Sequence, residues 1–305
     1  MSTATRSPVP TVRSARQVRR LRRRAALGRF WSAYRRQRAG VAGLIVFAVF
    51  LGLALAAPLL FSHDELEVTK ATGRVLAPPY QGYPLGTDES GRSVLALVVW
   101  GARVSLLVGI AATVISMAIG TLVGISSGHF GGWAGGVLER LTDWFLVIPF
   151  LPLAIALATV LGSSLLNVII VIGVTSWPGT ARLVRAQTLA VESRPYLERA
   201  RVLGGGHWHQ MSRHVLPNVM PLVLANTTLT VAIAILSETT LSFLGLGDPF
   251  RVSWGTMLEN AFAAGAISAG AWWYLLPPGI AVVVVVLAFT LIGRAMENVL
   301  DPGER

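Results

Sequence analysis

The sequence predicts an all-α integral membrane protein with six transmembrane helices and both termini in the cytoplasm. Three observations support this fold class. The 305 residues are 53% hydrophobic and 13% charged, with a mean hydropathy of +0.61, so there is too little polar material to cover a soluble globule. The hydrophobic residues form runs long enough to cross a bilayer. The Lys and Arg residues are concentrated in alternate connecting segments, as expected for a membrane protein.

Six uncharged runs mark the expected spans. Residues 40–61 are uncharged over 22 positions, which at a rise of 1.5 Å per residue is enough to cross a ~30 Å hydrocarbon core. Pro149 and Pro152 predict kinks in the third run without removing a span, because neighbouring helices satisfy the freed backbone groups. The five later runs are 104–126, 144–163, 165–180, 219–237 and 275–292.

The distribution of charge predicts the orientation. Residues 1–38 contain twelve Arg and no acidic residue, and the first acidic residue is Asp64. With both termini inside, the cytoplasmic segments hold 21 of the 26 Lys and Arg residues, which satisfies the positive-inside rule. We expect the basic arm to lie at anionic lipid and to be partly disordered, and no nucleic-acid recognition module accompanies it.

Three regions follow from this reading. Residues 1–38 form the basic cytoplasmic arm. Residues 39–98 comprise the first transmembrane helix and an extracytoplasmic loop. Residues 99–305 form a five-helix core that contains a polar cytoplasmic loop at 187–217.

The polar interval "YLERARVLGGGHWHQMSRHVLPN", residues 196–218, begins with a predicted amphipathic helix. Ser193 is placed to cap its start, and Gly204–Gly206 are placed to end it. A helix of about ten residues is marginal in water, so it must pack on something else. Its apolar face is small and its polar face carries both signs of charge, which favours a protein partner over a membrane surface. The apolar face comprises Tyr196, Ala200 and Leu203, and the polar face Arg194, Glu198 and Arg201.

Several stretches resemble one family of transport proteins. Glu198-x-Ala200-x-x-x-Gly204, followed by "LPN" at 216–218, resembles the cytoplasmic coupling loop of bacterial ABC-importer permeases. Residues 85–109, residues 241–258 and the terminal "LDPGER" look like the second, C-type permease subunit of the dipeptide, oligopeptide and nickel importers. The resemblance extends over nearly the whole chain from about Trp31.

The resemblance implies a multi-pass subunit of the bacterial cytoplasmic membrane. Its partners would be a second, homologous permease, two ABC ATPase subunits and an extracytoplasmic substrate-binding protein. The implied cargo is a di- or oligopeptide. The implied ATPase-coupling residues are Tyr196, Glu198, Ala200, Arg201, Leu203 and Gly204.

ATP hydrolysis is expected to take place on the partner subunits and not on this chain. A phosphate-binding Walker A loop places Lys after Gly, but the single lysine, Lys70, precedes Ala71 in an external loop. The chain is therefore predicted to be a transport subunit with no enzymatic activity and no cofactor of its own, while ATP and Mg²⁺ bind the partner ATPases.

Polar residues suggest two further sites. Glu238 is an acid with apolar sequence on both sides, and an intramembrane carboxylate is by default a functional candidate. Asn226 and Thr230 lie on the same predicted span, so the three residues are candidates for the translocation path. Asp88 and Arg92, four residues apart, are expected to pair in a receptor-facing loop that also includes Trp254.

Three alternative functions are weighed against the transport subunit. An ion-coupled secondary transporter or channel would also be polytopic, although such proteins usually carry several ionisable groups at mid-membrane. His207, His209 and His214 are near each other in sequence, but no acid or thiol accompanies them, so no metal site is predicted. "GISSG" at 124–128 matches a serine-hydrolase string, but no strand precedes it and no histidine is expected at its depth.

Overall fold

The computed structural model describes residues 28–300, which leaves most of the basic arm and residues 301–305 outside the described part. Within this range the regular structure is helical, and two isolated β-bridges lie in the 61–93 loop. Five helices are long and apolar enough to span a membrane. They are α2 (Arg38–Leu60), α3 (Val94–His129), α6 (Leu165–Glu192), the continuous helix His207–Phe243 and α11 (Trp272–Leu300).

The continuous helix has three parts and connects the two ends of the molecule. It begins with α8 (His207–Gln210), passes through a π-helical turn at Met211–Val215 and continues as α9 (Leu216–Phe243). Its 37 residues correspond to a length of ~55 Å at 1.5 Å per residue.

The third expected span differs from the simple kinked helix of the prediction. Helices α4 (Gly132–Val147) and α5 (Phe150–Leu161) are separate and meet at an angle of 90°. The break falls at Ile148 and Pro149, where both residues have extended ψ values of 123° and 128°. Proline disfavours the helical conformation of the residue before it, so the chain leaves the helix there. The described part therefore has five spans, or six if this bent pair counts as one.

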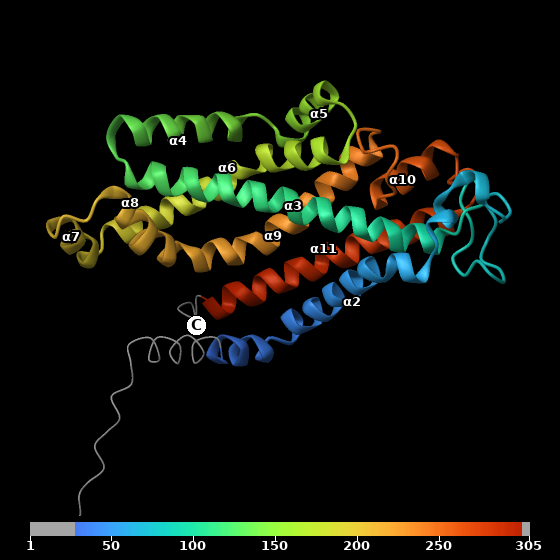
Figure 1. Ribbon diagram of the computed structural model, residues 1–305, viewed down its shortest axis with the longest axis horizontal. Helices are drawn as coiled ribbons and strands as arrows, with labels where there is room; N and C mark the ends of the chain where they lie inside the picture. The colour runs from blue at the N-terminus through green and yellow to red at the C-terminus, as the bar shows by residue number, and fades with distance from the viewer. Residues whose placement is uncertain (1–27, 301–305) are drawn as a thin grey trace, which may run out of the picture.

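Helices α3 and α6 lie side by side over most of their length (Figure 1). Small residues make this close approach possible. A Cβ atom added to Gly124 would lie 2.6 Å from the Ala181 carbonyl oxygen and 2.7 Å from the Val184 Cβ. Gly120 and Gly128 stand one turn before and after it and are similarly crowded. Gly120, Gly124 and Gly128 thus form a close contact between the two helices, which we call the glycine seam; small residues often have this role in membrane proteins.

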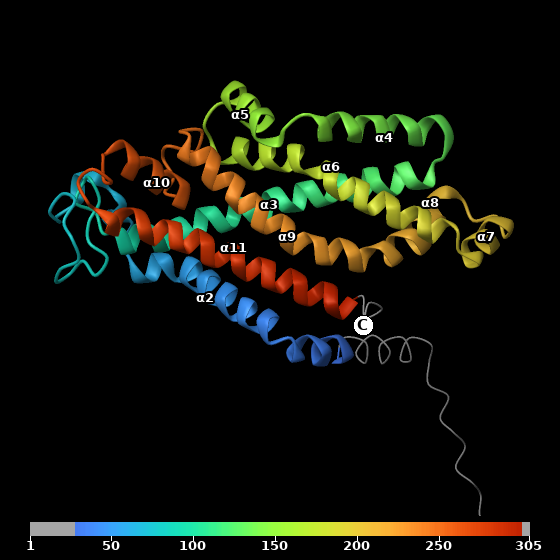
Figure 2. The same ribbon diagram turned by 180° about the vertical axis from the view of Figure 1, so that it is seen from behind.

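Figure 2 shows which segments lie at the two ends of the bundle. Helix α7 (Pro195–Val202) lies at one end, and the start of α2 and the end of α11 are the ends of those helices nearer to it. The 61–93 loop and α10 (Trp254–Ala263) lie at the other. Along the sides, large apolar side chains face outward, and Leu59 and Leu122 are 89% and 65% exposed. Outward-facing leucines of this kind belong in contact with lipid or with other membrane helices.

Candidate functional site: a fastened helix at one end and a charged cavity at the other

The short helix α7 is set off from its neighbours by a tight turn on each side. Helix α6 ends at Glu192, Arg194 occupies the N-cap position of α7, and Pro195 starts the helix. Proline is well tolerated there because the first helical N–H has no intrahelical acceptor. The predicted cap at Ser193 is wrong, since its hydroxyl donates back to the Ala190 carbonyl at 3.0 Å.

The end of α7 lies where the sequence predicts it. Gly204 has a φ of +81°, the left-handed conformation that favours glycine. The Gly205 N–H donates to the Ala200 carbonyl at 2.9 Å, and the Gly204 N–H donates to the Arg201 carbonyl at 2.9 Å. This pair of bonds is a Schellman motif, which ends the helix and turns the chain into α8 at His207.

The side of α7 that packs on this chain is formed by Leu197, which the sequence pattern does not single out. Leu197 is fully buried and packs in a cluster with Val191, Val215 and Val219. Leu197 was missed because its neighbours in sequence are polar, and only the tertiary fold shows which residue of the helix points inward. Tyr196, Glu198 and Arg201 are exposed, and Ala200 is half-buried.

The opposite side of the loop presents apolar side chains to the outside. Val202 is 83% exposed, Leu203 is 86% exposed, and Trp208 is 76% exposed. Exposed apolar residues at the tip of a polar loop are a feature of protein docking surfaces, because they bury apolar area when a partner binds. We refer to Val202, Leu203 and Trp208 as the apolar tip.

A network of polar side chains fastens this loop to the long helices. The His129 Nδ1 atom lies 2.5 Å from the Glu192 carboxylate, and its Nε2 atom lies 2.9 Å from the His207 Nδ1 atom. Glu192 also accepts from the Arg201 guanidinium, whose Nε atom donates to the Gln210 side chain at 3.1 Å. The network joins the ends of α3 and α6 to α7 and α8, so it offers a route by which movement of α7 can reach both long helices.

The histidines of the loop separate into two pairs. His207 pairs with His129 across the network, whereas the ring centroids of His209 and His214 lie 5.5 Å apart. In residues 28–300 no cluster of three or more His, Cys, Asp or Glu side chains is arranged to hold a metal ion. The role of His129 was missed because 63 positions separate it from Glu192 in the sequence.

Asn226 and Thr230 lie within an interhelical polar cluster. The Asn226 amide donates to the Thr180 hydroxyl at 3.1 Å, and the Thr230 hydroxyl lies 3.7 Å from the Met117 sulfur. These contacts connect α9 to α6 and α3. Within this single chain, both side chains therefore contribute to helix association.

The side chain of Glu238 is buried between helices of this chain. It is 2% exposed and accepts hydrogen bonds from the Ser105 and Ser242 hydroxyls, each at 2.9 Å. The Ser105 oxygen also accepts from the backbone N–H of Trp254 at 3.2 Å. Glu238 thus connects α9 to α3 and to the start of α10.

Trp254 is not on the surface of the chain, contrary to its predicted receptor-facing position. Its side chain is fully buried, and the indole N–H donates to the Val98 carbonyl at 3.0 Å. A buried indole with its N–H satisfied is a packing anchor. Sequence reasoning placed it outside because it follows a polar loop, but Ser253 caps α10 and the ring turns inward.

Asp88 and Arg92 form the predicted pair and organise the external loop. The Arg92 Nε atom donates to Asp88 at 2.6 Å, and the backbone N–H groups of Ser90 and Arg92 donate to the same carboxylate at 2.9 and 2.7 Å. Asp88 is fully buried. Burial raises the pKa of the Asp88 carboxyl above its usual range, while the Arg92 guanidinium opposes that shift.

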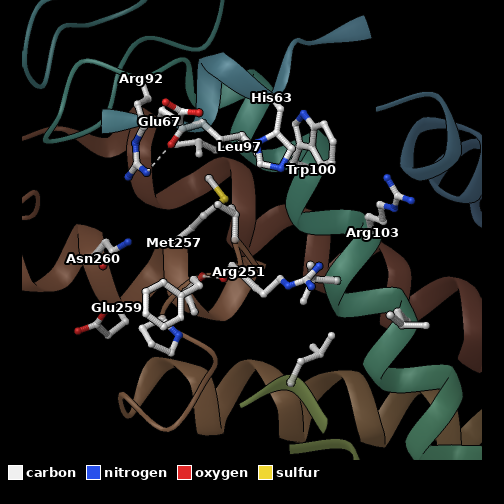
Figure 3. A pocket seen from close by; sticks show the side chains of 18 of the residues that line it. His63, Glu67, Arg92, Leu97, Trp100, Arg103, Arg251, Met257, Glu259 and Asn260 are labelled. Carbon is white, nitrogen blue, oxygen red and sulfur yellow. Dashed lines mark hydrogen bonds between the residues drawn. The ribbon is translucent and has the colours of Figure 1, made fainter. Parts of the chain in front are cut away.

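A cavity of about 690 Å³ lies beside this pair (Figure 3). Its wall combines the outer part of α3, the loop before it, residues 249–252 and α10. Trp100 provides an aromatic surface, and the charged side chains that line the cavity are Glu67, Arg92, Arg103, Arg251 and Glu259. A cavity of this size with a few convergent polar groups is within the range of small-molecule sites.

Comparisons with known proteins identify the class of this membrane protein. Residues 120–305 match the family model described as binding-protein-dependent transport system inner membrane component. Residues 26–79 match the N-terminal TM domain of oligopeptide transport permease C. The chain therefore belongs to the binding-protein-dependent transport permeases of bacterial ABC importers, multi-pass proteins of the inner membrane.

Similar proteins narrow the class to the C-type permeases of peptide importers. The di/tripeptide transport system permease protein of Pseudomonas aeruginosa is 37% identical, over 90% of this chain and 92% of that protein. The glutathione transport system permease protein of Pectobacterium atrosepticum is 32% identical, over 90% of each chain. The dipeptide transport system permease protein of Bacillus subtilis is 32% identical, over 89% of this chain and 84% of that protein.

Proposed function

We propose that this chain is one of two permeases in an ATP-driven importer of di- or oligopeptides, coupled to ATPase subunits through α7. The observation that carries this proposal is the combination of an apolar tip with a network that fastens α7 to two long helices. The names of the similar permeases, which refer to dipeptides, tripeptides and glutathione, support a peptide as cargo.

The orientation follows from charge. The α7 end carries most of the Lys and Arg residues of the connecting segments, and the positive-inside rule assigns such an end to the cytoplasm. The start of α2 and the end of α11 are the ends of those helices nearer to α7 (Figure 2). Both termini and the coupling loop then face the ATPases, while the 61–93 loop and α10 face the substrate-binding protein.

The proposed mechanism uses α7 as the point of contact with an ATPase. The apolar tip fills a groove in the partner, and Glu198 and Arg199 lie at its polar rim. ATP and Mg²⁺ bind the ATPase subunits, and closure of those subunits displaces α7. The Glu192 network passes the displacement to α3 and α6, whose glycine seam keeps them together. With the second permease, these helices open the path alternately to either side.

A matched pair of glycine variants tests the coupling role. Gly204 requires a positive φ, whereas Gly206 has a φ of −65° and open space around it. Gly204→Val should distort the end of α7 and lower peptide uptake per ATP hydrolysed, while Gly206→Val should leave that ratio near the wild-type value. Equal ratios for the two variants, in complexes of normal composition, would refute coupling through α7.

The secondary-transporter alternative is separated by a different measurement. The tagged chain is purified from membranes, its companions are identified, and the complex is reconstituted with peptide and receptor. Uptake should require ATP and the ATPase subunits. Uptake by the chain alone, driven by a proton or sodium gradient, would instead establish ion-coupled transport.

A further inference from the structure

The charged cavity at the α10 end has a lining that the coupling mechanism does not use. It lies at the opposite end of the bundle from α7, where a solute released by an extracytoplasmic receptor would arrive first. Its volume of about 690 Å³ lies within the range of about 300–1,000 Å³ that is typical of small-molecule sites. The cavity is therefore large enough for a short peptide.

The charges in the cavity wall fall into two groups. Arg92 is committed to Asp88 and Glu89, at 2.6 and 3.3 Å, and Glu67 is paired with Lys70 at 3.0 Å. In contrast, Arg103, Arg251 and Glu259 form no ion pair with any residue in the range 28–300. The Arg103 guanidinium lies 5.8 Å from the centre of the Trp100 ring. Two guanidinium groups and one carboxylate thus remain available to a ligand.

The positively and negatively charged side chains that form no ion pair lie on opposite sides of the cavity. Figure 3 shows the Arg251 side chain crossing the middle of the cavity toward the α3 side, where Arg103 and Trp100 lie. Glu259 and Asn260 lie on the opposite side, on α10. A ligand that reaches both sides would meet positive charge at one end and negative charge at the other.

We propose that this cavity is a subsite for a short peptide with free termini, in which Arg251 and Arg103 bind the α-carboxylate and Glu259 binds the α-ammonium group. Guanidinium groups bind carboxylates through two parallel N–H···O bonds, and an ammonium group pairs with a carboxylate. Trp100 offers an apolar surface to a peptide side chain. The proposal rests on the proposed function, because it assumes a peptide cargo.

Binding is measured on the intact importer complex, in phosphatidylcholine nanodiscs and without its receptor, by equilibrium dialysis of radiolabelled trialanine. Arg251→Gln and Glu259→Gln should each weaken binding by about tenfold or more, and Arg251→Lys should weaken it less because the charge remains. Arg74→Gln is the matched control, since Arg74 is an arginine of the external loop that does not line the cavity. It should bind trialanine as the wild type does.

Modified peptides test the assignment of the two ends. Trialanine amide should bind the wild type poorly, and Arg251→Gln should bind the amide and the free acid about equally. N-acetyl-trialanine should likewise bind the wild type poorly, and Glu259→Gln should bind the acetylated and the free peptide about equally. Equal binding of all three peptides to the wild type, or unchanged binding in both Gln variants, would overturn the proposal.

The remaining outcomes separate this proposal from others. If the wild-type complex imports trialanine with ATP and receptor while the variants bind and transport normally, the subsite is wrong and the importer function stands. If the wild-type complex does not import peptide, the proposed function itself fails. If anionic lipid displaces trialanine in an Arg251-dependent manner and the amide binds like the acid, the cavity binds a lipid phosphate and the peptide subsite is wrong.

Discussion

The glycine seam between α3 and α6 gives a prediction whose magnitude follows from the structure. In Gly124→Ala, the new methyl group would lie 2.6 Å from a backbone oxygen of α6 and 2.7 Å from the Val184 Cβ. Neither atom belongs to the flexible end of a side chain, so the two helices must move apart. Overpacking of this kind costs ~1–3 kcal/mol.

The comparison with Gly52→Ala isolates that cost. Gly52 lies inside α2, and no heavy atom comes within 4 Å of the point where its new methyl group would lie. Both substitutions replace a mid-helix glycine, so the gain in helix propensity of about 1 kcal/mol is common to both and cancels. Gly124→Ala should therefore be less stable than Gly52→Ala by ~1–3 kcal/mol.

Thermal unfolding of the detergent-purified importer measures the difference. Domains of about 150–250 residues change their Tm by ~2–4 °C per kcal/mol, so Gly124→Ala should unfold about 2 °C or more below Gly52→Ala. The order of the two transitions is the critical observation. If Gly124→Ala is as stable as Gly52→Ala, then α3 and α6 are not in close contact at this seam.

Three further predictions concern the polar contacts. Glu238→Gln can keep hydrogen bonds to both serines and should retain assembly and uptake. Glu238→Ala should accumulate poorly because it leaves the hydroxyls of Ser105 and Ser242 unpaired. A Gln variant that assembles but does not transport would assign Glu238 to the translocation path. His129→Ala should lower uptake per ATP hydrolysed while the complex stays assembled, and His209→Ala, outside the Glu192 network, should not; equal ratios in the two would remove His129 from the coupling route. Asp88→Asn should lower the stability of the external loop by ~1.5–3 kcal/mol because it breaks the ion pair with Arg92. Protease should then cut this loop faster in spheroplasts. An unchanged cleavage rate would contradict a structural role for the pair.

The sequence predicted the spans well because the bilayer imposes a simple constraint. Uncharged runs of sufficient length must be helical across lipid, since backbone groups have no water there. The same reasoning could not predict the break at Pro149. A proline is compatible with a kink or with a complete break, and the packing of α4 and α5 decides between them.

The site was predicted less completely because its geometry depends on contacts between distant parts of the chain. The role of Gly204 could be predicted from the sequence, since a helix end in the αL conformation favours glycine. The inward face of α7 could not be predicted, because the burial of Leu197 depends on Val219, which belongs to a different helix. The burial of Trp254 and the contact of His129 with Glu192 have the same origin. Local patterns identify elements, but they do not report which side chains meet.

The unbroken helix from His207 to Phe243 has a geometric consequence. Its two ends are ~55 Å apart along the helix axis, so a change in inclination of about 10° displaces one end by ~10 Å relative to the other. Glu238 lies near the far end, within the last two turns of α9, and lines a small cavity together with Arg251 of the charged cavity. In the proposed mechanism, a slight swing that starts at the ATPase would therefore reach the opposite surface as a displacement wider than a peptide backbone.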